Sequence, residues 1–148
     1  MRFINEIIIH CSDTRPDQDI SAAIIDRWHK ERGFDCIGYH FFIKLDGTIE
    51  VGRNIDKIGA HCKGHNSNSI GICYAGGTVR HNDYKYYSDT RTPEQKRALY
   101  YLLIILLHSF PTITRISGHK DYAKVACPCF DVHEDYGKLI EFVRKSEY

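Results

Sequence analysis

Apolar residues in this chain are grouped either in short continuous runs or in longer segments with helical spacing. Two of the short runs lie at 3–10, which is rich in isoleucine, and at 70–75, and a further short strand is expected over 114–117, ahead of His119. Continuous apolar runs of this length, bounded by polar residues, are typical of buried strands. We therefore expect a buried strand over 3–10 and a second apolar strand over 70–75.

A β-hairpin is predicted in the middle of the first half of the chain. The apolar segments 39–45 and 48–52 flank the dipeptide Asp46-Gly47. Asp-Gly between two such segments is one of the strongest local signals for a tight turn joining antiparallel strands.

The first and last helices are predicted from capping residues and apolar spacing. Ser21 can cap a helix over 22–32, which turns an apolar stripe that includes Trp28 toward the core. A final helix is expected over 133–145, with Phe142 among its inward residues.

The middle helix has the clearest start in the chain. Thr92 and Gln95 form a capping box around Pro93, and the helix must end before Pro111. Because this segment is apolar on nearly all sides, we expect it to be sandwiched within the core. The polar segment 78–92 before it is expected to be the one sizeable loop.

Strands and helices alternate along the chain, which predicts a single α/β domain over residues 1–148. Its architecture should be a central mixed β-sheet flanked by helices on both faces. His10 and His119 are both expected just past the end of a strand, where a polar segment begins. Sheets of this class usually place their functional sites at such strand ends.

Composition narrows the function classes. The chain has 148 residues, 43% hydrophobic and 26% charged, which suits one globular domain. A net charge of +1 gives no basic field for nucleic acid, and no apolar run is long enough to span a membrane. We find no export signal at the start, and expect synthesis in the cytoplasm and a monomer.

A candidate metal site emerges from residue types and spacing. Of six cysteines, Cys127 follows His119 by eight positions in a polar segment interrupted by Pro128. Imidazole and thiolate are the ligands that zinc prefers, and His10 is the best third candidate. Three protein ligands with an open fourth position describe a catalytic zinc site. Cys129 is the rival of Cys127, although a small buried hydrophobe is the more common role of a free cysteine.

Two residues of the Gly- and Asn-rich segment 59–68 are candidates for substrate binding. His61 is either an ordinary surface histidine or a residue at the border of the groove, and we favour the groove. Asn66 is a second candidate for the same role, with an ordinary turn residue as the alternative.

Six short motifs, taken in order, resemble a known family. They are His10-Cys11-Ser12, Ile37-Gly38-Tyr39-His40-Phe41, Gly59-Ala60-His61, Ser69-Ile70-Gly71-Ile72, Gly118-His119-x-Asp121 and Cys127-Pro128-Cys129-Phe130-Asp131-Val132. This series is similar to that of the type 2 zinc-dependent N-acetylmuramoyl-L-alanine amidases. That family includes T7-type phage lysozymes and the peptidoglycan recognition proteins.

The resemblance implies hydrolysis of the amide between the lactyl group of N-acetylmuramic acid and L-alanine of the peptidoglycan stem peptide. It implies zinc ligands at His10, His119 and Cys127, and catalytic assistance by Tyr39. The phage enzymes carry a catalytic lysine two residues before the cysteine ligand, where this chain has Val125. We therefore name Lys124, one residue earlier, as the candidate for that role.

The sequence is compatible with three hypotheses for the function. The leading one is a peptidoglycan amidase acting as a phage or prophage endolysin, made in the cytosol and released onto the wall. A delivered effector or a wall-recycling enzyme would look similar. The alternatives from other classes are a peptidoglycan-binding receptor domain without catalysis and a structural zinc module with four protein ligands.

Overall fold

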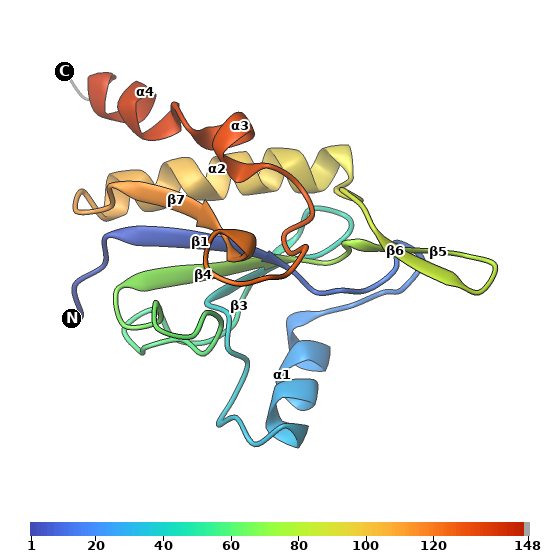
Figure 1. Ribbon diagram of the computed structural model, residues 1–148. Coiled ribbons are helices and arrows are strands. Elements are labelled where there is room, and N and C mark those ends of the chain that lie inside the picture. The colour runs from blue at the N-terminus through green and yellow to red at the C-terminus, as the bar shows by residue number, and fades with distance from the viewer. Residues whose placement is uncertain (147–148) are drawn as a thin grey trace.

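Strand β1 (Glu6–Cys11) is one of the inner strands of a five-stranded sheet in the computed structural model, which describes residues 1–146. The expected domain over 1–148 thus extends two residues beyond the described part. The remaining elements are β2 (Phe41–Ile43), β3 (Ile49–Val51), β4 (Ser69–Tyr74), β5 (Thr78–His81), β6 (Tyr84–Tyr87), β7 (Arg115–Gly118), α1 (Ala22–Glu31), α2 (Pro93–Ser109), the 3₁₀ helix His119–Asp121, α3 (Val132–Tyr136) and α4 (Leu139–Lys145) (Figure 1).

The five-stranded sheet has the order β3-β2-β4-β1-β7. β1 is parallel to both β4 and β7, β2 is parallel to β4, and β3 is antiparallel to β2. Every residue of β1 and β4 is buried, as expected for strands covered on both faces. The predicted mixed sheet is confirmed, and β2 and β3 form the predicted hairpin.

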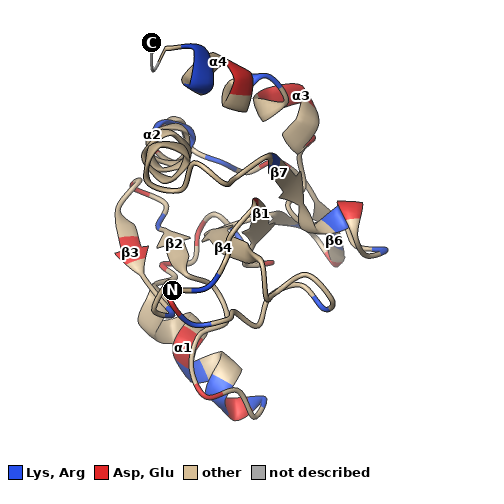
Figure 2. Ribbon diagram, turned by 90° about the vertical axis from the view of Figure 1, so that its left-hand side faces the viewer, with Lys and Arg blue, Asp and Glu red and all other residues tan. Residues whose placement is uncertain are grey.

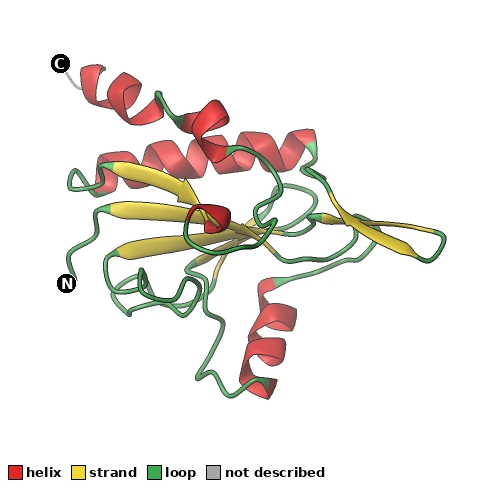
Figure 3. Cartoon of the chain, viewed as in Figure 1, coloured by secondary structure: helices red, strands yellow, loops and turns green. Residues whose placement is uncertain are grey.

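Helices cover both faces of this sheet, as predicted. α2, α3 and α4 lie on one face, and α1 lies on the other (Figures 1 and 3). The larger core joins Ile7 and Ile72 of the sheet to Leu103 of α2, and the smaller core packs Ile25 of α1 against Phe42. Charged residues lie mostly on the helices and loops, whereas β4 carries none (Figure 2).

The start of the chain differs from the prediction. β1 begins at Glu6 rather than residue 3, and Phe3 is 63% exposed. His10 belongs to the strand and is buried, so it does not lie past the strand end as expected. The apolar run hid this boundary, because hydrophobicity alone does not reveal where ladder pairing begins.

The expectation of a loop over 78–92 was wrong. Its first part forms the β5–β6 hairpin, which projects away from the sheet (Figure 3). The hairpin turns at Asn82, whose φ is +55°, a left-handed conformation that Asn tolerates. The signal for strands was weak because the tyrosines at 84, 86 and 87 are exposed and no apolar face alternates.

Two helix predictions also need correction. α2 is not buried all round, because Tyr101 and Ile105 are 62% and 58% exposed. The single last helix is two short ones, interrupted at Gly137, and Phe142 faces outward rather than inward. Gly is a weak helix former, so the break there has a local cause. Within residues 1–146, no helix has the length and apolar character needed to cross a bilayer.

Candidate metal centre and catalytic cavity

His10, His119 and Cys127 come together at one end of the sheet. Their ligand atoms all lie within 4.8 Å of one another. The two imidazole rings are 4.7 Å apart between centroids. In the part of the chain that the structure describes, no other group of three His, Cys, Asp or Glu side chains meets this condition.

Parallel pairing explains why the two histidines meet. Ile9 of β1 is opposite Gly118 of β7, so the next residue of each chain segment is a histidine. The carboxyl ends of neighbouring parallel strands lie side by side, which brings His10 and His119 to the same edge. The topology therefore positions two donors that are 109 residues apart in the sequence.

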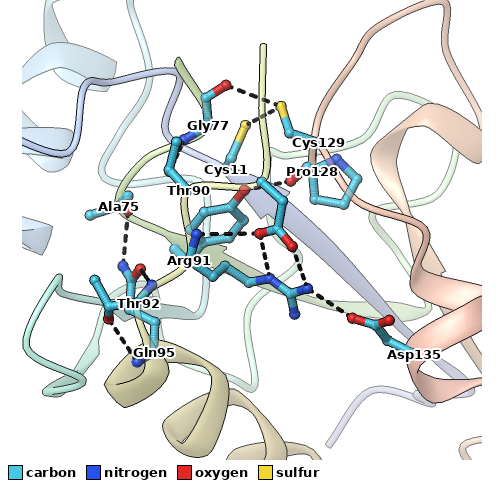
Figure 4. A network of polar contacts seen from close by, with 12 residues as sticks. Cys11, Ala75, Gly77, Thr90, Arg91, Thr92, Gln95, Pro128, Cys129 and Asp135 are labelled. Carbon is cyan, nitrogen blue, oxygen red and sulfur yellow. Dashed lines mark hydrogen bonds and ion pairs between the residues drawn. The ribbon is translucent and has the colours of Figure 1, made fainter. Parts of the chain in front are cut away.

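The loop that carries Cys127 is tied to the sheet on both sides of the cysteine. The Cys11 backbone N–H donates to Cys127 Sγ at 3.1 Å, and Tyr74 Oη donates to the Pro128 carbonyl at 2.6 Å. The Cys129 thiol donates to the Gly77 carbonyl at 3.3 Å and lies 3.7 Å from Cys11 Sγ (Figure 4). Cys129 thus helps to anchor the loop, and its sulfur points to Gly77 and Cys11.

A buried arginine anchors the continuation of this loop. The Arg91 guanidinium pairs with Asp89 at 2.9 Å and with Asp135 of α3 at 2.8 Å (Figure 4). It also lies 3.4 Å from the centroid of the Phe130 ring. Asp131 accepts hydrogen bonds from the backbone N–H groups of His133 and Glu134, so it caps the first turn of α3.

The electrostatics of the centre favour neutral histidines and a protonated neighbouring thiol. Burial lowers the pKa of both His10 and His119, so each is neutral and able to donate a lone pair near pH 7. Hydrogen bonding with Cys127 and burial raise the pKa of Cys11 to about 12. Cys11 therefore remains a thiol. Cys127 is the cysteine whose sulfur lies within 4.8 Å of a ring nitrogen of each of the two histidines.

A cavity of about 550 Å³ opens at two of the three donors, whereas His10 is buried behind its wall. His119 and Cys127 form part of its wall, together with Tyr39 and Lys124. Two nitrogens and one sulfur with an open side match the donor set of a catalytic zinc site, whereas a structural zinc site is closed by four protein ligands.

Tyr39 and Lys124, the two predicted catalytic assistants, both line the cavity. The Tyr39 ring is 5.1 Å from the His10 ring, centroid to centroid. Lys124 is exposed, and Val125 beside it also reaches the wall. The peptide segment between His119 and Cys127 therefore forms one side of the cavity.

The two candidates for substrate binding lie elsewhere. His61 is behind His10, with its Nδ1 2.8 Å from His10 Nε2, and it is not part of the cavity wall. Asn66 Oδ1 accepts hydrogen bonds from the backbone N–H groups of His61 and Cys62, each at 2.9 Å. Asn66 thus shapes the turn that carries His61.

Sequence reasoning missed several residues of the cavity wall. Trp28, predicted to be core, packs against the smaller core but also lines the cavity with Arg32 of the same helix end. Tyr87 reaches the cavity from the β5–β6 hairpin. No spacing in the sequence connects Tyr87 to the site, since the hairpin itself was not predicted.

Comparisons with known proteins agree with this geometry. Residues 1–137 match the family described as N-acetylmuramoyl-L-alanine amidase. The chain is 43% identical over 126 residues to the endolysin of Enterobacteria phage T3, which covers 85% of this chain and 81% of that endolysin. It is 42% identical to the endolysin of Escherichia phage T7, again over 126 residues and with the same coverage of both chains. Among solved structures, the N-acetylmuramoyl-L-alanine amidase LysC from Clostridium intestinale superposes with a TM-score of 0.76 at 34% identity, covering 93% of this chain and 86% of LysC.

Proposed function

Because this chain belongs to the N-acetylmuramoyl-L-alanine amidase family, it hydrolyses an amide bond of peptidoglycan, and we propose that His10, His119 and Cys127 hold the zinc ion for that reaction. The bond is the one between the lactyl group of N-acetylmuramic acid and L-alanine. The observation that carries the metal proposal is the convergence of two imidazoles and one thiol within 4.8 Å at an open cavity.

The donor set suits amide hydrolysis at neutral pH. A zinc ion bound by three protein ligands lowers the pKa of a water molecule from about 15.7 to about 7 and polarises a carbonyl. The residues contribute neutral imidazoles, because burial lowers the pKa of His10 and His119. The N–H of Cys11 donates to Cys127 Sγ and fixes the position of this sulfur beside the two histidines.

Tyr39 is proposed to donate a hydrogen bond to the oxygen that gains negative charge during attack on the amide. Burial raises the pKa of its phenol well above the ordinary value, so the hydroxyl keeps its proton. A fixed donor aimed at a developing oxyanion is among the largest single contributions to hydrolysis. The position of Tyr39 beside His10 supports this role.

Lys124 is proposed to contribute a positive charge from the cavity wall. It lies on the segment between His119 and Cys127, three residues before the cysteine. A cation there stabilises the negative charge that develops in the reaction and attracts anionic groups of the substrate.

We propose an endolysin role for the protein, because its T3 and T7 relatives carry that name and share more than 40% of residues over four fifths of their length. In this role the enzyme cuts stem peptides from the glycan strands of the wall.

The test is mass spectrometry of purified peptidoglycan digested by the protein, with a zinc chelator, without it, and after zinc is restored. We expect free stem peptides that begin with L-alanine, lost with chelator and recovered with zinc. Cys127→Ser should abolish their release, whereas Cys36→Ser, which changes a thiol away from the cavity, should not. Equal cleavage by rigorously metal-free protein would remove the zinc proposal, and normal activity of Cys127→Ser would remove that ligand.

A further inference from the structure

Behind the metal centre, the half-buried His61 contacts a proposed ligand. His61 Nδ1 lies 2.8 Å from His10 Nε2, and the two rings meet edge to face. This contact uses one of the two nitrogens of His10. Only Nδ1 of His10 is then left to face a metal ion.

The hydrogen-bond directions from Ser69 through His61 to His10 follow from one backbone carbonyl, that of His65. Ser69 Oγ is 2.6 Å from the carbonyl oxygen of His65, which can only accept, so the serine gives its single proton there. Ser69 Oγ is also 3.2 Å from His61 Nε2 and must accept from it. The proton of neutral His61 is therefore on Nε2.

The proton on His61 Nε2 determines which nitrogen of His10 is protonated. With its proton on Nε2, His61 has a bare Nδ1 that accepts from His10, so His10 carries its own proton on Nε2. We propose that Ser69 and His61 form a hydrogen-bond relay that fixes the tautomer and ring orientation of His10 and leaves its Nδ1 free to bind metal. The inference rests on the proposed metal role of His10, and it makes His61 a positioning residue.

The surroundings of His61 are built to hold its ring in this place. A Cβ on Gly71 would lie 2.6–2.9 Å from three atoms of the His61 ring, and a Cβ on Gly59 would lie 2.7 Å from its Cδ2. Asn66 fixes the backbone of His61 from the other side. Two glycines thus provide the space, and a turn fixes the chain direction.

The arrangement predicts an effect on metal affinity separate from any effect on turnover. Partners behind a ligating histidine are worth about 10–100-fold in metal affinity. His61→Phe keeps a ring but has no acceptor, so zinc affinity should fall by about that factor. His61→Asn places an amide oxygen near the position of Nδ1 and should recover most of the loss.

The experiment measures zinc affinity of the full chain by competition with a chromophoric chelator, with circular dichroism as the check on folding. In parallel, ¹⁵N NMR of the metal-free protein reports which nitrogen of His10 carries the proton. Wild type should show Nε2–H, and His61→Phe should show a mixture of tautomers. The control is His81→Asn, an exposed histidine of the β5–β6 hairpin, which should leave zinc affinity unchanged.

Unchanged zinc affinity and an unchanged His10 tautomer in folded His61→Phe would overturn the relay. If that variant does not fold, Ser69→Ala decides, because it frees His61 to shift its proton to Nδ1. An unaltered His61 tautomer in Ser69→Ala would then overturn the relay. Failure of the metal proposal looks different, since wild type itself would not bind zinc.

Discussion

Tyr39 lies beside His10 in the cavity wall, and burial keeps its hydroxyl protonated. Tyr39→Phe removes only this hydroxyl, so the variant should fold and bind zinc normally. Its turnover should fall by about 10²–10³, the usual cost of losing one oxyanion donor. Steady-state cleavage of a soluble muropeptide checks this, with Tyr101→Phe on the exposed face of α2 as the matched control. Turnover equal to wild type would remove Tyr39 from the mechanism.

Among the described residues, Lys124 is the only lysine in the cavity wall. It precedes Val125, the position at which the resemblance to phage enzymes implies a catalytic lysine. Lys124→Gln should lower turnover by about 10², within the range for one charged assistant. Lys120→Gln, an exposed lysine of the same segment, should have little effect. Full activity of Lys124→Gln would mean that the reaction proceeds here without a lysine.

For individual residues, the sequence indicated the side chains that converge on the candidate metal site better than it indicated the residues that surround them. His119 and Cys127 were identified because their side-chain chemistry and spacing are informative by themselves. The contact of His61 with His10 was not predicted, because it joins positions 51 residues apart and depends on the orientation of both rings. Trp28 shows the same limit, since an apolar stripe does not distinguish core from cavity wall.

Among the elements, α2 begins with a cap that also joins it to the sheet. Thr92 Oγ1 accepts from the Gln95 N–H at 3.0 Å and donates to the Leu45 carbonyl at 2.7 Å. Thr92→Ala removes both bonds and should lower the free energy of unfolding by about 1–2 kcal/mol. Urea denaturation measures this, and Thr92→Ser, which keeps the hydroxyl, should lose much less. A Thr92→Ala protein as stable as wild type would show that Gln95 alone maintains the helix start.

The elements that sequence predicted well are those whose burial is complete or strongly one-sided. β4 and the start of α2 agree with their predicted positions, because apolar runs and a capping box are local features. The β5–β6 hairpin and the break at Gly137 were missed. Both lie where the chain is exposed, and there apolar patterning carries little information.

For the whole molecule, buried neutral histidines predict sensitivity to acid. His40 Nδ1 accepts the Gly71 N–H at 3.0 Å, and burial lowers the pKa of His40 to about 4. Between pH 6.5 and about 4 the unfolded chain binds a proton at this residue that the folded chain does not. The free energy of unfolding should therefore fall as pH falls through this window, by up to about 1.4 kcal/mol per pH unit from His40.

Denaturant unfolding at several pH values measures this slope. His40→Asn removes the titrating group and offers an amide oxygen to Gly71, so its slope should be shallower than that of wild type. His81→Asn, on the exposed hairpin, should have the wild-type slope. Equal slopes for His40→Asn and wild type would assign the acid sensitivity to other residues.

The architecture of the whole chain was predictable because alternation of strands and helices restricts the topology strongly. The same alternation placed two histidines at one edge of the sheet, since parallel strands end together. The third donor was found by chemistry rather than topology. Its loop is held by Tyr74, Gly77 and Arg91, residues whose contacts no local pattern predicts.

One property of the cavity gives the protein a built-in optical probe. The chain contains a single tryptophan, and Trp28 is half-buried in the wall of the cavity. Indole emission depends on the polarity around the ring, so a ligand that displaces water there shifts the spectrum toward the blue. Occupancy of the cavity can thus be followed by intrinsic fluorescence in unlabelled protein, including variants that bind without turnover.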